Sequence, residues 1–397
     1  MDVSRRAVVV GGGALGLSLV ARPAWAWDST GSVAGSGTGA DPAFVWDDEA
    51  DQLVGSLMSR GLIASVNTAL RSWSTNSQAL PAGLPADLVD FIERARQLPS
   101  WASPAKLAAV TEFTKKRGNY LGVLYGLGSG MMSTAIPKEA KAVYYSKGGA
   151  AMKDRIAKTA KLGYDIGALN AYQPDGQMVV TAIKTRLTHA AVRNLLPQSA
   201  RWAQTRTETL PISQADMLVT WHSLPTYCLR TMRSWGVTVP DADADAFLHL
   251  WQVSAHMLGI KDEYIPATWA AANAQSTALL DPVLGPTPEG IELAAILMNL
   301  VAEYDQGASK PMLHAFTRYL CGDQIADWVQ IPREPGYDQL VQRSWPWYVK
   351  ARETGMPFPG APDVAWALDE LLRQGVLAFL SEGKPIYIEM PDANRSF

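Results

Sequence analysis

The chain has 397 residues, of which 48% are hydrophobic and 18% are charged. Its 35 basic and 38 acidic side chains give a formal net charge of −3, which argues against a nucleic-acid partner. Such a composition builds a large apolar core, and no stretch beyond the N-terminal region is long and apolar enough to span a bilayer. Two cysteines, Cys228 and Cys321, do not make a disulfide framework, and the sequence leaves open whether they pair.

The N-terminal segment contains GGGALG at 11–16, which matches the G-x-G-x-x-G fingerprint of a dinucleotide-binding turn. The context excludes that interpretation, because Pro23 ends the helix that would follow and no second strand comes after it. The paired arginines at 5–6, the apolar stretch behind them and Ala-Trp-Ala at 24–26 instead predict a twin-arginine export signal over residues 1–26. We therefore expect a secreted, extracellular protein with no stable membrane anchor.

The rest of the chain is predicted to be a linker followed by one all-α domain. Residues 27–42 are rich in Gly, Ser and Thr, which predicts a flexible linker. In residues 43–397 apolar residues recur at helical spacing, Asp87 and Ser103-Pro104 are helix start signals, and Pro/Gly clusters mark turns. The stretch 126–141 breaks the helical pattern. The predicted helices are 43–59, 62–74, 85–98, 103–126, 147–169, 175–195, 212–235, 241–258, 263–280, 286–305, 308–329, 336–354 and 362–382.

Among the five histidines, His189 has the most informative neighbours. Arg186 lies three residues before it and Arg193 four after it, so that all three share one helix face. Flanking positive charges disfavour a bare cation at this histidine. They suit haem, because the imidazole would ligate iron while the arginines pair with the propionates. The alternative is a polar stripe that faces water, and the pattern alone favours it.

A second helix, MKDRIAKTAKLGYDIG, places Arg155, Lys158 and Thr159 on one face. A solvated basic face is the ordinary interpretation. If Lys158 points inward instead, burial would leave it neutral and able to ligate a metal, with the Thr159 hydroxyl beside it. Glu139, in the irregular stretch just before this helix, is a candidate base if it borders a pocket and is otherwise simply solvated.

The remaining histidines carry weaker signals. His222 precedes a proline kink, where function and strain are equally compatible with the sequence. His314 and Arg318 share a helix face and would form a plain structural pair, and His249 and His256 lie seven apart on one helix as core or surface residues. The signatures HExxH, CxxC, GxSxG and the Walker loop are absent from the sequence.

The stretches RIAKTAKLGYDIGAL (155–169) and KTRLTHAAVRNLL (184–196) resemble the latex clearing protein family of b-type haem rubber oxygenases. The resemblance implies a globin-like helical core with additional surrounding helices, and haem b as the cofactor. It implies oxidative endo-cleavage of the cis-1,4 double bonds of polyisoprene by dioxygen, which gives oligomers with aldehyde and ketone ends. We expect the protein to act on this polymer as a monomer.

The same resemblance implies roles for individual residues. His189 would be the proximal iron ligand and Lys158 the distal ligand of a closed resting state, with Thr159 and Arg155 beside it. Glu139 would be the catalytic base. The resemblance also implies that Arg193 supports the haem site and that His222 and Arg318 lie near the core. The predicted cofactor-binding residues are therefore His189, Lys158, Arg193, Arg186, His222 and Arg318.

Three other functions remain compatible with the sequence. A related haem oxygenase or peroxidase would act on another apolar substrate. A secreted non-enzymatic protein would bind haem or a hydrophobic ligand without turnover. A cofactor-free helical protein would show no Soret band after purification.

Overall fold

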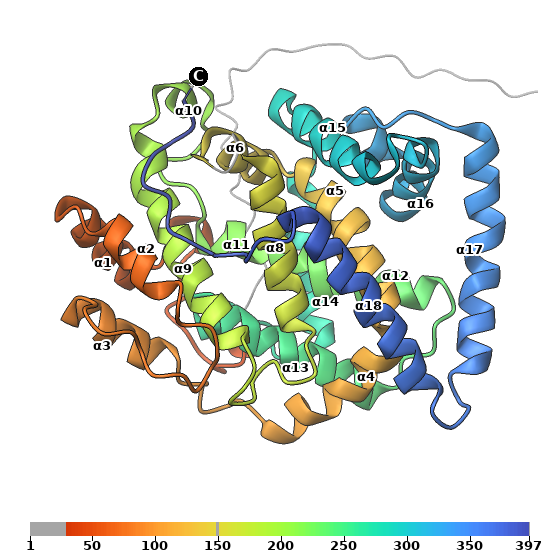
Figure 1. Ribbon diagram of the computed structural model, residues 1–397, viewed down its shortest axis with the longest axis horizontal. Helices are drawn as coiled ribbons and strands as arrows, with labels where there is room; N and C mark the ends of the chain where they lie inside the picture. Colours follow the sequence, from red (N-terminus) through yellow and green to blue (C-terminus); the bar gives the residue numbers. More distant parts are fainter. Residues whose placement is uncertain (1–28, 148–150, 397) are drawn as a thin grey trace, which may run out of the picture.

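The structure, a computed structural model, describes residues 29–147 and 151–396. Within these ranges it contains helices and no β-strand, apart from isolated bridges that join Ser32 to Pro266 and Ser146 to Asn394. The all-α fold class is therefore confirmed (Figure 1). The α-helices are α1 (Asp48–Ser59), α2 (Ile63–Leu70), α3 (Ala86–Ala95), α4 (Pro104–Val123), α5 (Gly130–Thr134), α6 (Pro137–Tyr145), α8 (Met152–Ile166), α9 (Met178–Leu195), α10 (Ala200–Thr205), α11 (Gln214–Trp221), α12 (Tyr227–Ser234), α13 (Asp241–Met257), α14 (Trp269–Leu279), α15 (Pro288–Ala302), α16 (Lys310–Trp328), α17 (Pro335–Gly355) and α18 (Ala361–Ser381).

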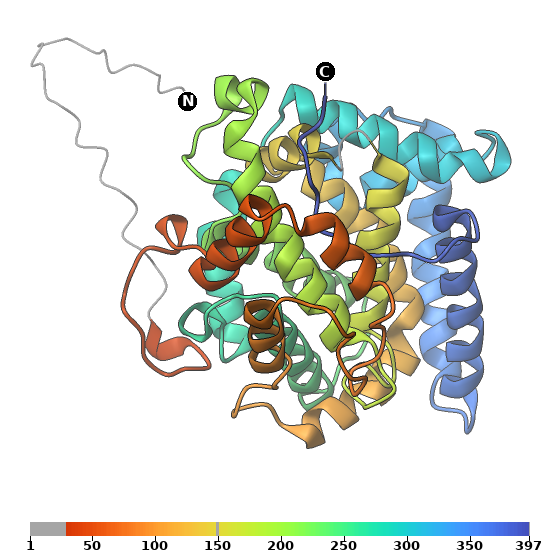
Figure 2. The same ribbon diagram turned by 60° about the vertical axis from the view of Figure 1, so that its left-hand side comes forward.

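Two helices, α9 and α13, form the centre of the molecule. From Ala246 to Ala255 every residue of α13 is buried, because the sequence there is apolar on all sides of the helix. α13 packs against α4 and α9, and α1 packs against α9 (Figures 1 and 2). The central position of α9 fixes the backbone that carries His189.

Helix starts follow local capping chemistry. Ser103 accepts a hydrogen bond from the backbone N–H of Lys106 at 3.3 Å and Pro104 follows it, as the sequence predicts for the start of α4. Ser213 and Asp216 form a reciprocal capping box at the start of α11. Asp87, by contrast, is not the cap but lies in the first turn of α3, after Pro85 at the N-cap. Its negative charge there stabilises the positive end of the helix dipole.

Two π-helical turns interrupt the regular helices. The predicted break at 126–141 is a π-turn, η3 (Leu124–Ser129), which runs on into α5 and α6. A second π-turn, η5 (His222–Thr226), joins α11 to α12 and contains Pro225, which has no backbone N–H to donate. The two turns touch, since the Ser129 and Ser223 hydroxyls lie 3.2 Å apart.

Residues 29–42 differ from the flexible linker that the composition predicts. The backbone N–H of Val33 donates to the Ile265 carbonyl at 2.9 Å, and the Tyr264 hydroxyl donates to the Ala40 carbonyl at 3.0 Å. Hydrogen bonds to the body of the protein therefore hold a segment whose own composition favours disorder. The predicted export signal lies in residues 1–28, outside the described ranges.

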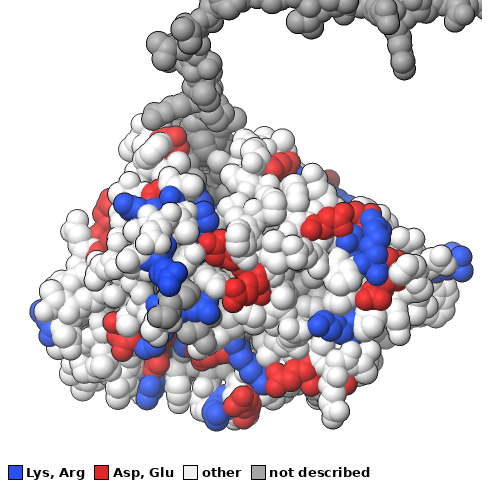
Figure 3. Space-filling view, turned by 90° about the horizontal axis from the view of Figure 1, so that it is seen from above, with Lys and Arg blue, Asp and Glu red and all other residues white. Residues whose placement is uncertain are grey.

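Helices α15 to α18 lie together at one side of the molecule, with α18 against α4 and α8 (Figure 1). On the face shown in Figure 3, basic and acidic groups are interspersed and separated by uncharged surface. No single described helix is long and apolar enough to cross a membrane. One pair, Pro42–Ser59 with Ile63–Leu70, passes the same test jointly but is bent by 114°.

Candidate active site

Three consecutive helices, α6, α8 and α9, carry the strongest site candidates. Pro137 lies in the first turn of α6, where backbone N–H groups have no partner within the helix, so that proline loses no hydrogen bond there. This helix start places Glu139 in the first turn. α8 carries Arg155 and packs against α9, which carries His189. The fold therefore brings together three of the residues that the sequence singles out.

Arg155 connects the other two groups electrostatically. Its positive charge lowers the pKa values of both Glu139 and His189. Burial lowers the pKa of Arg155 itself, and the negative charge of Glu139 opposes that effect. No ion pair joins its guanidinium to any carboxylate in the described residues. Arg155 thus supplies a positive charge between a carboxyl group and an imidazole.

His189 is held as a neutral imidazole. Burial lowers its pKa to about 3, and the charges of Arg193 and Arg155 lower it in the same direction. Its Nδ1 atom is buried and has no hydrogen-bond partner within the described residues. A buried nitrogen without a partner costs free energy, and the neutral ring is the form that ligates iron.

Glu139 has the properties of a general base at neutral pH. Burial raises its pKa to about 7, while the hydrogen bond from Thr220 and the charge of Arg155 act to lower it. The Thr220 hydroxyl donates to Glu139 Oε2 at 2.9 Å. A carboxyl group with a pKa near the working pH is ionised often enough to accept a proton and basic enough to hold it.

Lys158 is not the buried neutral lysine that its position beside Arg155 suggests. Its Nζ lies 2.7 Å from Asp154 Oδ2, one helical turn earlier, and its side chain is 28% exposed. Thr159 is exposed and its hydroxyl donates to the Arg155 carbonyl at 3.1 Å. Both side chains satisfy partners on α8 itself, because residues four apart on a helix are neighbours.

The two arginines that flank His189 are already paired with carboxylates. Arg186 forms a two-point ion pair with Asp47, whose carboxylate also caps α1, and the expectation that Arg186 is free for a propionate is not met. Arg193 donates to Asp51 at 2.7 Å and to the Ile212 carbonyl at 3.3 Å. Its Nη2 atom remains buried without a described partner, so that Arg193 keeps a donor for an anionic group.

His222 and Arg318 have structural partners away from this group. Both nitrogens of the fully buried His222 ring are hydrogen-bonded, Nδ1 to Thr226 at 2.9 Å and Nε2 to Gln275 at 2.8 Å. Such a ring has no free lone pair for a metal, so that His222 is not a candidate iron ligand in this arrangement. Arg318 donates to the Ile331 and Pro332 carbonyls and pairs with Asp323 and Asp327.

The other polar candidates are also accounted for by local partners. His314 pairs with Glu334 at 3.1 Å, and His256 pairs with Asp262 at 2.6 Å. Cys228 and Cys321 are free thiols, which answers the question that the sequence left open.

The donor set suits haem better than a bare metal ion. No group of three or more His, Cys, Asp or Glu side chains in residues 29–147 and 151–396 is arranged to hold such an ion. A haem iron needs only axial ligands from the protein, because the porphyrin supplies the others. His189 offers one neutral imidazole, and Arg193 offers a buried donor for an acidic substituent.

Thr220 is the residue of this group that the sequence does not indicate. It lies two positions before His222 on α11, and nothing in its neighbourhood distinguishes it from other helical threonines. Its contact with Glu139 joins residues 81 apart, so that only the packing of α6 against α11 reveals it. The capping box of Ser213 and Asp216, which fixes the start of α11, is the one local signal that bears on its position.

Comparison with protein families and solved structures identifies similar proteins over nearly the whole chain. Residues 115–351 match the family model described as "ER-bound oxygenase mpaB/B'/Rubber oxygenase, catalytic domain". A rubber oxygenase from Streptomyces sp. (strain K30) is 55% identical to this chain over an alignment 401 residues long, gaps included. The alignment covers 99% of this chain and 98% of that protein. A solved structure of latex clearing protein LCP in the closed state superimposes with a TM-score of 0.84 and 56% identity, over 93% of this chain and 100% of that one.

Proposed function

Because the chain belongs to the rubber oxygenase (latex clearing protein) family, we propose that it is a haem b-dependent dioxygenase that endo-cleaves the cis-1,4 double bonds of polyisoprene. The observation that carries the proposal is the partly buried, electrostatically coupled set of Glu139, Arg155 and His189, which lies in the matched catalytic domain. The products would be oligomers with one aldehyde and one ketone end.

His189 would hold the haem iron through its imidazole, and Arg193 Nη2 would pair with an acidic haem substituent. When bound, haem supplies redox-active iron for chemistry with dioxygen. Lys158 would serve as a second iron ligand only after it leaves Asp154 and loses its proton, because only the neutral amine carries a lone pair. The low pKa of His189 keeps its lone pair available throughout the physiological range.

Glu139 would remove an allylic proton from an isoprene unit. Arg155 and Thr220 stabilise the ionised carboxylate against the desolvation that burial imposes, so that a fraction of Glu139 is charged near pH 7. Cleavage places one oxygen atom of dioxygen on each carbon of the broken double bond and consumes no net proton. The Glu139 carboxyl group therefore returns the proton before the next turnover.

Export by the twin-arginine route fits this activity. The signal-like segment at residues 1–26 would carry the folded protein out with its haem already inserted, and an insoluble polymer must be attacked outside the cell. The mature protein would act as a monomer on the polymer. Fractionation of culture supernatant, with and without an Arg5→Lys/Arg6→Lys signal, tests the route.

The decisive experiment measures oxygen uptake and products on polyisoprene latex with the haem-loaded protein. We expect oligomers with carbonyl ends, and we expect His189→Ala to lose the Soret band and the activity together. His256→Gln is the matched control, because His256 pairs with Asp262 and belongs to no part of the proposed site. Absence of carbonyl-ended oligomers from the haem-loaded protein would refute the polymer as substrate. An undiminished haem spectrum in His189→Ala would refute the ligand assignment.

A further inference from the structure

Helix α18 is amphipathic in the reverse sense of an ordinary surface helix. Leu368, Leu371 and Leu372 are 59%, 67% and 61% exposed, whereas the Asp369 side chain is only 7% exposed. Val364 and Val376 continue the exposed apolar row at helical spacing. We call these five residues the outer face of α18. Surface helices normally turn their apolar side inward, so that this reversal requires a partner for the apolar side.

The charged residues of α18 hold this orientation in place. Asp369 accepts hydrogen bonds from the Asn119 backbone N–H on α4 at 2.9 Å and from Arg352 on α17 at 2.7 Å. Arg373 pairs with Glu370 and lies over the Tyr164 ring of α8, 5.4 Å from its centre. The inward side of the helix is thus specified by ionic and aromatic contacts, which leaves the leucines outward.

The outer face is uncharged along its length. The exposed residues of α18 between 364 and 378 are Val364, Ala367, Leu368, Leu371, Leu372, Gln374, Gly375, Val376 and Ala378. An anionic lipid surface would select lysines and arginines around such a row, and none is exposed in this stretch. The composition therefore matches an uncharged hydrocarbon partner.

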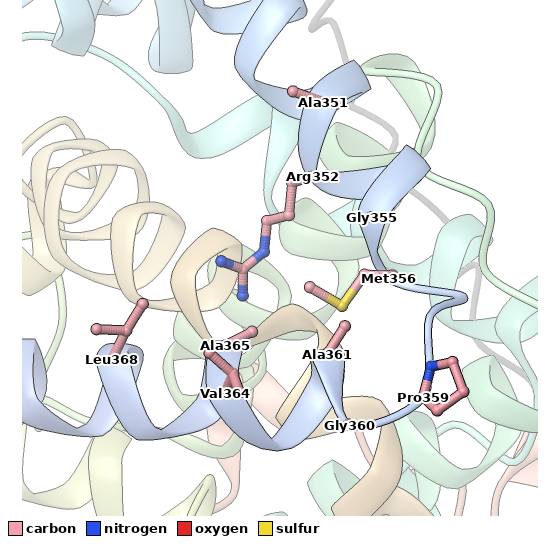
Figure 4. Close-up of a pocket in the computed structure, with 10 residues that line it drawn as sticks. All are labelled: Ala351, Arg352, Gly355, Met356, Pro359, Gly360, Ala361, Val364, Ala365 and Leu368. Atoms are coloured by element: carbon pink, nitrogen blue, oxygen red, sulfur yellow. The ribbon is translucent and has the colours of Figure 1, made fainter.

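The face borders an apolar pocket at the start of α18. Its volume is about 490 Å³, and its lining includes Met356, Val364, Ala365 and Leu368 (Figure 4). Arg352 also lines it, with its guanidinium paired to Asp369. In that loop Phe358 is 67% exposed. A row of leucines that leads into an apolar hollow offers an extended hydrocarbon chain more contact than isolated side chains would.

The location connects this surface to the proposed active site. α18 packs directly on α8, which carries Arg155 and Lys158, and Leu380 shares a small buried cluster with Ala157 of α8. α18 also lies beyond residues 115–351, the span of the matched catalytic domain. The helix therefore covers the catalytic domain without belonging to it.

We propose that the outer face of α18 is the surface through which the protein adsorbs to the hydrocarbon polymer particle, apart from the residues that cleave the chain. The inference rests on the proposed function for the identity of the hydrocarbon. Adsorption buries the leucines against uncharged polymer and keeps α8 close to the particle. Leu368, Leu371 and Leu372 contact the particle and take no part in the reaction.

In the test, haem-loaded protein is mixed with washed polyisoprene latex, and the latex is then separated by flotation. The measured quantity is the amount of protein that leaves the solution with the latex. In a Leu368→Gln/Leu371→Gln/Leu372→Gln variant, we expect adsorption to fall by at least about tenfold, because burial of the exposed parts of three leucines together contributes at least that much. The matched control replaces three exposed apolar residues elsewhere, Phe44, Leu98 and Val283, with glutamine and should adsorb within about twofold of the wild type. Equal adsorption by the triple variant and the wild type would overturn the proposal.

Two further arms identify other occupants of the face. Light scattering after gel filtration gives the oligomeric state of each protein. If the wild type is a dimer and the triple variant is a monomer, the face binds a second copy and the proposal fails. It also fails if vesicles of phosphatidylcholine and phosphatidylglycerol deplete the wild type as strongly as latex does. If the triple variant lost helicity or haem, single Leu371→Gln and Leu372→Gln variants would replace it, each with a loss of about threefold or more.

The proposed function and the adsorption surface fail in different ways. Carbonyl-ended oligomers report the reaction, whereas flotation reports adsorption without turnover. A wild type that adsorbs through α18 but yields no oligomers refutes the reaction and supports the surface. A triple variant that adsorbs normally refutes the surface, whatever its products. On short isoprenoid oligomers dispersed in detergent, the triple variant should keep its turnover within about twofold, because α18 supplies no reacting group.

Discussion

The protonation states of the site depend on the way in which a few buried residues share charge. Glu139 and His189 both experience strong desolvation, yet burial moves their pKa values in opposite directions, to about 7 and about 3. Burial favours the neutral form of each group, which is the acid for glutamate and the base for histidine. The positive charge of Arg155 then favours ionised Glu139 and neutral His189 at once. One guanidinium thus favours the protonation states that the proposed proton acceptor and the proposed iron ligand require.

The rate of polymer cleavage should follow the ionisation of Glu139. Activity is expected to fall as the pH drops below about 7, because protonation removes the base. Thr220→Val deletes a hydrogen bond that lowers the Glu139 pKa, so that the acid limb should move to higher pH by up to about one unit. Thr220→Ser keeps the donor and should leave the limb in place. The measurement is oxygen uptake on latex between about pH 5 and pH 9. Coincident limbs for Thr220→Val and the wild type would contradict this coupling.

Sequence reasoning at this scale identifies residue types better than side-chain directions. Glu139, Arg155 and His189 are predicted from their chemistry and from the family resemblance, and the fold brings them together. Lys158 has an equally suggestive position, but Asp154 four residues earlier offers it a closer partner. Thr220 escapes prediction because its role exists only across a tertiary contact.

At the scale of elements, apolar spacing predicts where helices lie but not where their hydrogen-bond register slips. The predicted helix 212–235 occurs as α11, η5 and α12 in one continuous run, and Pro225 explains the slip. The break predicted at 126–141 is real but consists of helical turns, because the closely spaced glycines permit a π-turn there. The reversed polarity of α18 cannot be read from spacing, since a helical pattern does not say which face meets the core.

Gly128 shows how closely the π-turns pack against their neighbours. A Cβ added at Gly128 would meet the Tyr227 ring at 2.8 Å and 2.9 Å, well inside ordinary contact. Gly128→Ala should displace Tyr227, whose hydroxyl donates to the Leu320 carbonyl at 3.0 Å, and destabilise the fold by about 1–3 kcal/mol. Urea unfolding of the haem-free and haem-loaded forms measures the change.

Gly126 in the same π-turn provides the control for this substitution. A Cβ there meets nothing within 4 Å, and the residue is exposed. Gly126→Ala should therefore be neutral or stabilise the fold by up to about 1 kcal/mol, because alanine restricts the unfolded chain more than glycine does. Equal losses in the two variants would mean that π-turn geometry, and not the Tyr227 contact, requires glycine.

At the scale of the whole molecule, paired polar groups join α17 and α18 to each other and to α4, so that part of the apolar side of α18 need not face inward. Arg352 of α17 pairs with Asp369 of α18, with side chains 12% and 7% exposed. Arg117 of α4 reaches Glu353 of α17 at 2.7 Å, and the Asn119 backbone N–H of α4 donates to Asp369 at 2.9 Å. Charges placed at this depth must be paired, since an unpaired one loses its hydration without compensation. The fold thereby attaches a helix with an exposed apolar face to the body of the protein.

The strength of this attachment is open to measurement through Arg352. Arg352→Gln leaves the Asp369 carboxyl group buried without its cation and removes a guanidinium that lies 5.5 Å from the centre of the Tyr120 ring. We expect a loss of about 3 kcal/mol in the free energy of unfolding, together with earlier proteolysis of the α17–α18 region. Arg94→Gln is the matched control, because Arg94 and Glu49 are 64% and 51% exposed and such pairs contribute less than about 1 kcal/mol. A comparable loss in both variants would show that burial of the pair is not what anchors α18. A large loss in Arg352→Gln alone, with the Soret band of the haem-loaded protein retained, would show that α17 and α18 are secured separately from the proposed haem site.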